Sequence, residues 1–279
     1  MAQAVLVTGL EPRRIAAGQG LSGKSGLQGS VQSLWRHPVK GFTPERLDEV
    51  VLSAGLCFPA DRLYAVEDGP SGFDPAAPRH ISKQKFTVLA KIAAVARIHT
   101  RYDDETGVLE ASLDDHPPLR APLRDADGRA AFAAWLAAVL GDEVSGPLKV
   151  LPAPGDHRFM DDERGYVSII NLASLRDLEA RIGRPVDPRR FRANLYVEGW
   201  PAWAENDATG GVQLGEVEAE LVKPIRRCVA THVDPDTGDR DIDVVRALFE
   251  AYGHMNCGIY VNVTGGGRLK VGEPAVLGG

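Results

Sequence analysis

Apolar positions in most of this chain follow the two-residue period of β-strands, and helical spacing is confined to a few segments. Short apolar or alternating runs are separated by Gly, Pro, Asn and Asp, which favour turns. The loop 103–107 ends in glycine between two such runs, which predicts a hairpin. The whole pattern predicts strands at 31–36, 46–52, 63–66, 90–102, 108–113, 166–170, 194–197, 213–222, 227–233, 258–263 and 268–271.

Three segments instead carry apolar residues three and four positions apart, the spacing of one helix face. The segment 127–140 is the first, and Gly141 ends it. A second helix begins after Asn171, a favourable N-cap residue, and ends at Gly183, while a third covers 245–252. Many short strands with few helices predict a mainly β (α+β) fold, in which barrel-like sheets carry peripheral helices.

The division of the chain follows from where Gly and Pro gather. Residues 1–30 are rich in glycine and lack periodic hydrophobicity, so we expect a flexible leader. Residues 31–125 are expected to form an N-terminal β-barrel-like domain, and 126–149 a connecting helix. Prolines punctuate the following junction, and residues 150–279 are expected to form a second barrel domain packed on the first.

Composition narrows the choice of partners. The 279 residues carry a net charge of −6, with 44% hydrophobic and 25% charged residues. The acidic balance argues against a general nucleic-acid surface, and no apolar run approaches the ~20 residues of a membrane span. Three widely spaced cysteines, Cys57, Cys228 and Cys257, fit neither a disulfide framework nor a four-cysteine iron–sulfur cluster. We therefore expect a cytoplasmic protein without nucleic-acid or membrane partners.

The stretch 223–238, KPIRRCVATHVDPDTG, carries the strongest chemical signal. Cys228 follows Arg226 and Arg227, and two cationic neighbours favour the thiolate that binds metals and attacks electrophiles. A thiolate among cations suits a soft metal that also carries an anionic organic ligand. From these residues alone, a buried cysteine that acts as a small apolar residue is the commoner case. The zinc-hydrolase motif H-E-x-x-H and the serine-hydrolase motif G-x-S-x-G are missing from the sequence.

Taken in order and spacing, the motifs resemble the MOSC proteins, named after the C-terminal domain of molybdenum cofactor sulfurase. The resemblance is to members that also have a MOSC N-terminal β-barrel domain. Its N-terminal part covers 34–113 and includes WRHPVK, ADR and HISKQ. Its C-terminal part covers 159–276 and includes SIINLASL, DPRRFRAN, RRC, DPDTG, CGIY and VGE.

The resemblance implies two packed β-barrel domains and a molybdenum–molybdopterin cofactor (Moco), without pyridoxal phosphate. It implies that Cys228 is the catalytic residue and metal ligand, which ligates molybdenum or carries sulfur. The pterin phosphate is an anion, for which Arg supplies a fork of donors and Lys a point charge. The residues implied to bind the cofactor are Lys40, Arg62, Ser82, Arg192, Asn194, Arg227 and Tyr260.

The members closest in layout are molybdenum-dependent reductases of N-hydroxylated compounds. They imply an oxidoreductase that reduces N-oxygenated or similar small substrates, with electrons from a separate protein of ferredoxin or cytochrome type. Sulfur transfer through a Cys228 persulfide and a non-catalytic cofactor carrier remain alternatives. Two positions depart from the family: Gly41 stands where the reductases usually have Ser, and Gln84 where many relatives have Arg. The second departure is expected to remove a charge from that loop.

Overall fold

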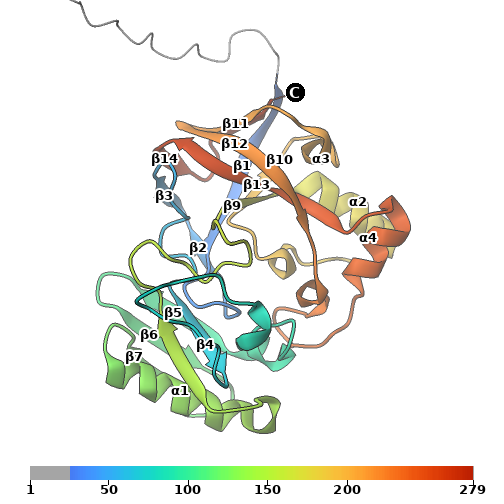
Figure 1. Cartoon of the computed structure of the whole chain (residues 1–279). Coiled ribbons are helices and arrows are strands. Elements are labelled where there is room, and N and C mark those ends of the chain that lie inside the picture. Colours follow the sequence, from blue (N-terminus) through green and yellow to red (C-terminus); the bar gives the residue numbers. More distant parts are fainter. Residues whose placement is uncertain (1–25, 279) are drawn as a thin grey trace, which may run out of the picture.

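A closed barrel forms the larger part of the molecule (Figure 1). The computed structural model describes residues 26–278. Within this range the chain is mostly β with few helices, which confirms the predicted fold class. Seven strands, in the order β10-β9-β13-β12-β11-β15-β1 and back to β10, close the barrel. They are β1 (Leu27–Arg36), β9 (Val167–Asn171), β10 (Leu195–Glu198), β11 (Gly211–Leu214), β12 (Val217–Arg226), β13 (Asn256–Gly265) and β15 (Pro274–Leu277).

The earliest strand, β1, completes this barrel between the late strands β10 and β15. Its first half pairs with β15 from Leu27↔Leu277 to Ser30↔Pro274, and its second half pairs with β10. Figure 1 shows β1 in blue among orange and red strands. Strand pairing thus crosses the expected division between 31–125 and the second domain. The leader predicted for residues 1–30 extends too far, because residues 27–30 already belong to β1. The rest of the predicted leader, residues 1–25, lies outside the described range.

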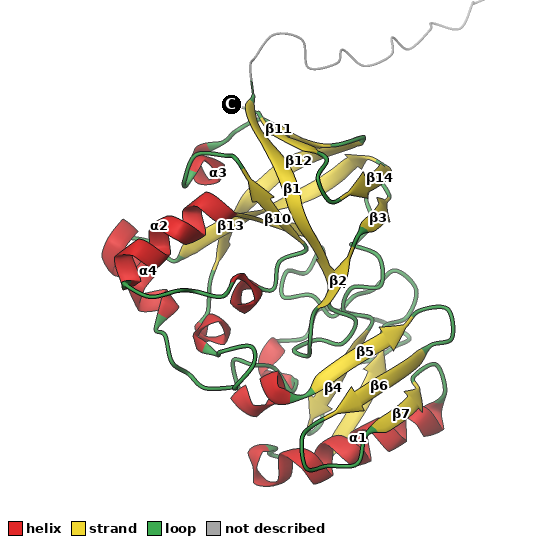
Figure 2. Ribbon diagram, turned by 180° about the vertical axis from the view of Figure 1, so that it is seen from behind, coloured by secondary structure: helices red, strands yellow, loops and turns green. Residues whose placement is uncertain are grey.

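A second, smaller body lies beside the barrel (Figure 2). It contains a two-stranded sheet, β4-β8, and a three-stranded sheet, β5-β6-β7, with α1 (Ala126–Leu140) packed against β7 and β8. Phe132 and Leu136 of α1 are fully buried, so the helix predicted as a connection is also a core element. The strands are β4 (Tyr64–Asp68), β5 (His99–Asp103), β6 (Val108–Ser112), β7 (Leu119–Pro122) and β8 (Leu148–Pro152).

The remaining strands and helices lie at the edges of the barrel. The short strand β2 (Glu45–Leu47) pairs with β1, and β3 (Glu49–Leu52) pairs with β14 (Gly267–Lys270). The helices are α2 (Leu172–Ile182), α3 (Ala204–Asp207) and α4 (Val244–Tyr252). As predicted, Asn171 caps α2 by accepting a hydrogen bond from the Ala173 amide at 3.1 Å, and Gly183 ends it with φ of 80°. Between residues 26 and 278, the helices are too short or too polar to cross a bilayer.

Several strand predictions need correction. Of the predicted strand 90–102, Ala93–Arg97 forms a 3₁₀ helix and only the end is strand; its alanines favour neither period. The predicted strand 227–233 is wrong, because β12 ends at Arg226 and Val229–His232 is a 3₁₀ helix. Short apolar runs of this kind do not separate strand from turn by periodicity. The strands 46–52 and 213–222 are each divided in two, and β7, β8 and β15 were not predicted.

Candidate cofactor pocket

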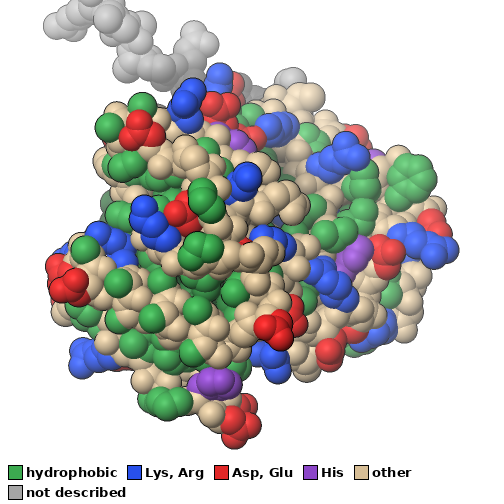
Figure 3. All heavy atoms as spheres, turned by 60° about the horizontal axis from the view of Figure 1, so that its bottom comes forward, with side chains coloured by type: hydrophobic (Ala, Val, Ile, Leu, Met, Phe, Trp, Pro, Cys, Tyr) green, Lys and Arg blue, Asp and Glu red, His purple; other side chains and the backbone are tan. Residues whose placement is uncertain are grey.

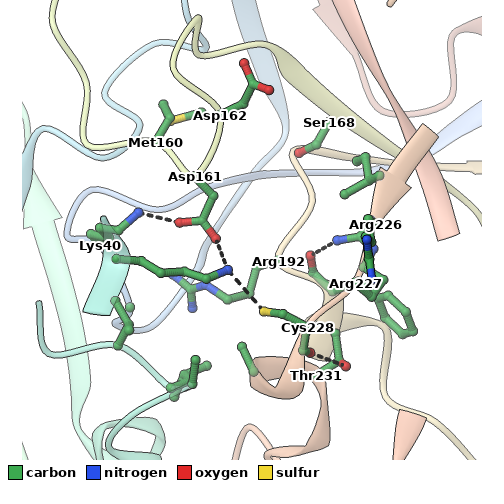
Figure 4. A pocket seen from close by; sticks show the side chains of 18 of the residues that line it. Lys40, Met160, Asp161, Asp162, Ser168, Arg192, Arg226, Arg227, Cys228 and Thr231 are labelled. Atoms are coloured by element: carbon green, nitrogen blue, oxygen red, sulfur yellow. Dashed lines mark hydrogen bonds and ion pairs between the residues drawn. The ribbon is translucent and has the colours of Figure 1, made fainter. Parts of the chain in front are cut away.

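A cavity of about 400 Å³ lies where the barrel meets the smaller body (Figure 4). Its walls come from loops of both bodies, from the loop between β8 and β9, and from the turn that follows β12. The lining contains eight basic side chains and two acidic ones, a local positive excess in an acidic protein. In contrast, Figure 3 shows basic and acidic side chains interspersed over one outer face. The charged lining residues are Lys40, Arg62, Lys83, Arg190, Arg192, Lys223, Arg226, Arg227, Asp161 and Asp162.

Cys228 lies at the turn after β12 and lines this cavity. The Cys228 carbonyl accepts hydrogen bonds from the Thr231 amide at 3.0 Å and the Thr231 hydroxyl at 2.9 Å, which hold the turn. The sulfur is partly exposed, whereas Cys257 is fully buried and burial raises the pKa of its thiol to about 12. Cys57 does not line the cavity. Cys228 is therefore the cysteine placed for chemistry in the described part of the chain.

A chain of charged groups crosses the cavity to this sulfur. Lys83 Nζ lies 3.2 Å from Cys228 Sγ and 3.1 Å from Asp161 Oδ2. The other oxygen of Asp161 accepts a hydrogen bond from Lys40 Nζ at 2.5 Å. Lys40 is 4% exposed and also donates to the Phe159 carbonyl at 2.9 Å. Figure 4 shows the Asp161 carboxylate pointing between Lys40 and Cys228.

The ionisation of these groups follows from their pairing. Desolvation raises the pKa of the Asp161 carboxyl, but the charges of Lys40 and Lys83 outweigh it and hold that pKa well below its usual range. Burial lowers the pKa of Lys40, although Asp161 opposes the change. Burial also acts to lower the pKa of Lys83, but Asp161 and the cysteine raise it above its ordinary value. The carboxylate is thus the internal counter-charge of both lysines.

Arg62 and Arg192 both line the cavity. Each has a left-handed backbone conformation, with φ of 49° and 51° respectively. Arg62 Nη2 donates to the Arg192 carbonyl at 3.1 Å, and Arg192 Nη1 donates to the Phe42 carbonyl at 2.7 Å. Arg192 Nη2 is buried and has no hydrogen-bond partner among residues 26–278. Burial and the nearby charge of Arg62 lower the pKa of Arg192 to about 9. The strained backbone of both arginines and the unsatisfied donor of Arg192 lie close together, and this combination indicates a site shaped to bind an anion.

Asp61 lies beneath the two arginines and is completely buried. Its carboxylate accepts hydrogen bonds from the His37 amide at 2.6 Å, from Asn194 Nδ2 at 3.0 Å and from Arg62 Nη1. Burial raises the pKa of this carboxyl, but the charge of Arg62 together with His37 and the hydrogen bond from Asn194 outweighs burial, so the net pKa is lowered. Asp61 therefore fixes Arg62 and joins segments of the two bodies.

Six of the eight predicted site residues line the cavity: Lys40, Arg62, Arg192, Arg227, Cys228 and Tyr260. Arg227 is already engaged, with Nε and Nη2 donating to the Cys257 carbonyl at 2.8 and 2.6 Å and Nη1 to the Phe191 carbonyl at 2.9 Å. Its guanidinium lies 5.3 Å from the centre of the Phe191 ring. Burial raises the pKa of Tyr260. The cofactor-binding roles of these residues stay predictions.

Asn194 and Ser82 are not among the cavity-lining residues, contrary to expectation. Asn194 is fully buried, and its Oδ1 accepts hydrogen bonds from the Ser168 amide at 3.1 Å and from the Ser168 hydroxyl at 2.8 Å. Ser82 is exposed and caps the 3₁₀ helix Lys83–Lys85, with its hydroxyl accepting from the Gln84 amide at 3.4 Å. Both side chains accept hydrogen bonds from backbone amides and thereby hold segments close to the cavity.

Lys83 and Asp161 were not predicted as site residues. Lys83 directly follows Ser82 in the HISKQ motif, so the motif marked the loop but not the side chain that reaches the sulfur. Lys83, the residue before Gln84, brings a positive charge of this loop to the Cys228 sulfur. Gly41 has a structural reason as well: its φ is 90°, and a Cβ there would lie 2.6 Å from the Thr87 carbonyl oxygen.

Two family models match the chain. Residues 28–146 match the MOSC N-terminal beta barrel domain, and residues 155–276 match the MOSC domain. Among solved structures, the YUAD protein from Bacillus subtilis is similar over 91% of this chain and 97% of that chain, with a TM-score of 0.44 and 12% identity.

Curated relatives match part of the chain. Mitochondrial amidoxime-reducing component 1 of Mus musculus is 32% identical over 121 residues, which are 39% of this chain and 35% of the relative. Mitochondrial amidoxime reducing component 2 of Bos taurus is 35% identical over 122 residues, with the same two shares. Molybdenum cofactor sulfurase of Caenorhabditis elegans is 32% identical over 113 residues, 37% of this chain and 16% of the relative. The match thus spans about a third of the two amidoxime-reducing components.

Proposed function

Since this chain belongs to the MOSC domain proteins, we propose that it is an oxidoreductase that binds Moco and reduces N-oxygenated or similar small substrates. The observation that carries the proposal is Cys228, partly exposed in a strongly basic cavity whose Arg192 Nη2 has no partner. The names of the amidoxime-reducing relatives support the reaction class.

The residues present fit an anionic cofactor with a soft metal. Arg192 Nη2 offers a free donor, and Arg62 and Lys40 offer further positive charge for a phosphate. Cys228 offers the thiolate ligand that a soft metal prefers. When bound, the cofactor would supply the two-electron chemistry, while the protein supplies orientation and electrostatics.

The chain's own groups would hold the reacting sulfur in place. Lys83 contacts Cys228 Sγ, and Asp161 fixes Lys83 from the other side. Breaking the substrate N–O bond takes up two electrons and two protons, and the oxygen leaves as water. We propose that the electrons come from a separate one-electron carrier of ferredoxin or cytochrome type and the protons from solvent.

Metal and pterin analysis tests the proposal directly. Protein made in a host that synthesises Moco is expected to contain molybdenum and pterin in near-equal amounts and to reduce an N-hydroxylated substrate with an artificial electron donor. Absence of both molybdenum and pterin would rule the proposal out. Bound pterin with no reductase activity and with transfer to an acceptor apoenzyme would instead identify a carrier.

Cys228→Ser replaces the soft thiolate with a neutral hydroxyl of similar size. We expect reductase activity to be lost almost completely, while the fold and the proposed pterin contacts of Lys40, Arg62 and Arg192 persist, with a stability change on the order of 1–2 kcal/mol. Cys257→Ser is the matched control, because Cys257 is buried outside the cavity and is expected to keep activity. Loss of activity in the control alone would show that the wrong cysteine has been assigned.

Sulfur transfer through a Cys228 persulfide is the second candidate. The partly exposed Cys228 beside Lys83 and the similarity to a molybdenum cofactor sulfurase favour it. This function predicts a cyanide-labile sulfur on metal-free protein, lost in Cys228→Ser. Wild-type protein with molybdenum and without labile sulfur would exclude it.

A further inference from the structure

The DPDTG stretch has no residue in the cavity lining, yet it forms a tight hairpin next to the Cys228 turn. An antiparallel bridge between Val233 and Arg240 closes the 233–240 hairpin. Asp234 Oδ1 accepts hydrogen bonds from the Asp236 and Thr237 amides, each at 3.0 Å. The hairpin is therefore held by its own hydrogen bonds, and its rigidity can fix the positions of the segments that it contacts.

Arg240 connects the two walls of the cavity. Its Nη1 donates to the carbonyl of Val229, the residue after Cys228, at 3.2 Å. Its Nη2 donates to the Leu89 carbonyl at 2.9 Å and the Ala90 carbonyl at 3.1 Å. Leu89 and Ala90 line the cavity from the smaller body. One guanidinium thus joins the cysteine turn of the barrel domain to the wall of the other body.

The opposite side of the hairpin is tied to the turn that leads into Arg192. Arg190 donates to the His232 carbonyl at 3.0 Å and to Asp234 Oδ2 at 2.8 Å. Arg189 makes two contacts with the Asp236 carboxylate, at 2.9 and 2.6 Å. The hairpin therefore contacts the turn that immediately precedes Arg192, which lines the cavity.

We propose that the 233–240 hairpin is a brace that fixes the distance between the Cys228 turn and the cavity wall at 88–90, with Arg240 as its positioning residue. The 3₁₀ helix Val229–His232 is a single short turn and holds its own position weakly. A misplacement of about 1 Å at a reacting group costs on the order of 10²-fold in rate. The proposal rests on the proposed function only in taking Cys228 as the reactive group.

Hydrogen–deuterium exchange of the cofactor-free protein tests the brace without any activity. Arg240→Gln removes the charged fork, and we expect amide exchange to rise about tenfold in the segments 228–233 and 88–95 together, since both lose the same charged contacts. Arg240→Lys keeps one charged donor and is expected to restore part of the protection. Arg246→Gln is the matched control, because Arg246 is exposed on α4 and, among residues 26–278, its side chain pairs only with Glu250.

A rise confined to 234–240, or no rise in 88–95, overturns the brace. If Arg240→Gln raises exchange throughout the barrel, Arg240→Lys decides: partial recovery of protection in both segments supports the brace, and recovery in one segment alone or in neither contradicts it. In the loaded enzyme, Arg240→Gln is expected to lower kcat with little change in KM, and Arg240→Lys to recover part of it. If the protein never binds molybdenum, the proposed function is wrong, but the exchange experiment on cofactor-free protein still tests the brace.

Discussion

Asp161 stands where an anionic ligand group would meet Lys40 and Lys83. A carboxylate that neutralises two ammonium groups presents two oxygens much as a phosphate does. Its presence keeps the buried ammonium of Lys40 paired, because an unpaired charge there would be costly. The same carboxylate must weaken the attraction of the cavity for anions.

Asp161→Asn should therefore tighten anion binding. We expect the affinity of the cofactor-free protein for inorganic phosphate, measured by calorimetry, to rise about tenfold because two lysines lose their counter-charge. Asp162→Asn is the control, since Asp162 also lines the cavity but pairs with the half-exposed Lys223 at 2.6 Å. Equal phosphate affinities in the two variants would contradict this account.

His37 provides a pH prediction. It is 1% exposed, its Nδ1 lies 3.3 Å from Asp61 Oδ1, and within the described part of the chain neither ring nitrogen makes a hydrogen bond. Burial, with the charges of Arg62 and Arg192, lowers the pKa of His37 to about 3. The unfolded value is about 6.5, so His37 favours the folded state fully above that pH and progressively less as the pH falls towards 3.

We expect the free energy of unfolding of the wild-type protein to fall between pH 6.5 and 4 by up to ~1.4 kcal/mol per pH unit through this residue. His37→Leu should flatten that dependence, and the exposed His116→Leu should not. Urea titrations at four pH values give the comparison. Parallel pH curves for all three proteins would show that His37 does not stay neutral in the fold.

The sequence indicated the cavity through residues inside motifs, and six of the eight predicted residues, four of them basic, lie together in its lining. It did not indicate Asp161, because a carboxylate in a basic cavity has no motif and is placed by the loop between β8 and β9. It misjudged Asn194 because a polar residue in a motif can equally serve the buried backbone and carboxylate beneath a site.

At the scale of elements, the turn at Gly41 offers a sharp test. Gly41→Ala places a Cβ 2.6 Å from the Thr87 carbonyl oxygen at a φ of 90°, so we expect a loss of about 1–3 kcal/mol in the free energy of unfolding. Gly72→Ala is the matched control, with φ of 79° and no atom within 4 Å of the added Cβ. Urea unfolding should show the larger loss at Gly41; equal losses would mean that backbone strain alone matters.

The helices α1, α2 and α4 were predictable because large apolar residues at helical spacing and a terminal glycine act locally. The turn that carries Cys228 was not. Its residues form an apolar run that reads as strand, and contacts from Arg240 and Arg190, distant in the sequence, hold it away from the sheet.

At the scale of the whole molecule, the barrel cannot close without β1. A fragment of residues 147–278 leaves β10 and β15 with unpaired edges and removes Val31 and Leu34 from the core. We expect this fragment to be aggregated or unfolded by circular dichroism and gel filtration. Residues 26–36 attached after residue 278 through a short glycine-rich linker should restore folding, because Leu27 pairs with Leu277. A compact, monomeric fragment without that addition would contradict this role of β1.

The position of β1 also bears on how the protein is made. The strand leaves the ribosome early, but Leu27 must wait for Leu277 before its pairing is complete. At ~5–20 residues per second, that wait is on the order of 10–50 s. During this time the first half of β1, Leu27–Ser30, lacks its β15 partner, and such an open strand edge favours misassociation. We therefore expect slower translation to reduce the yield of folded protein unless a chaperone covers the emerging strand.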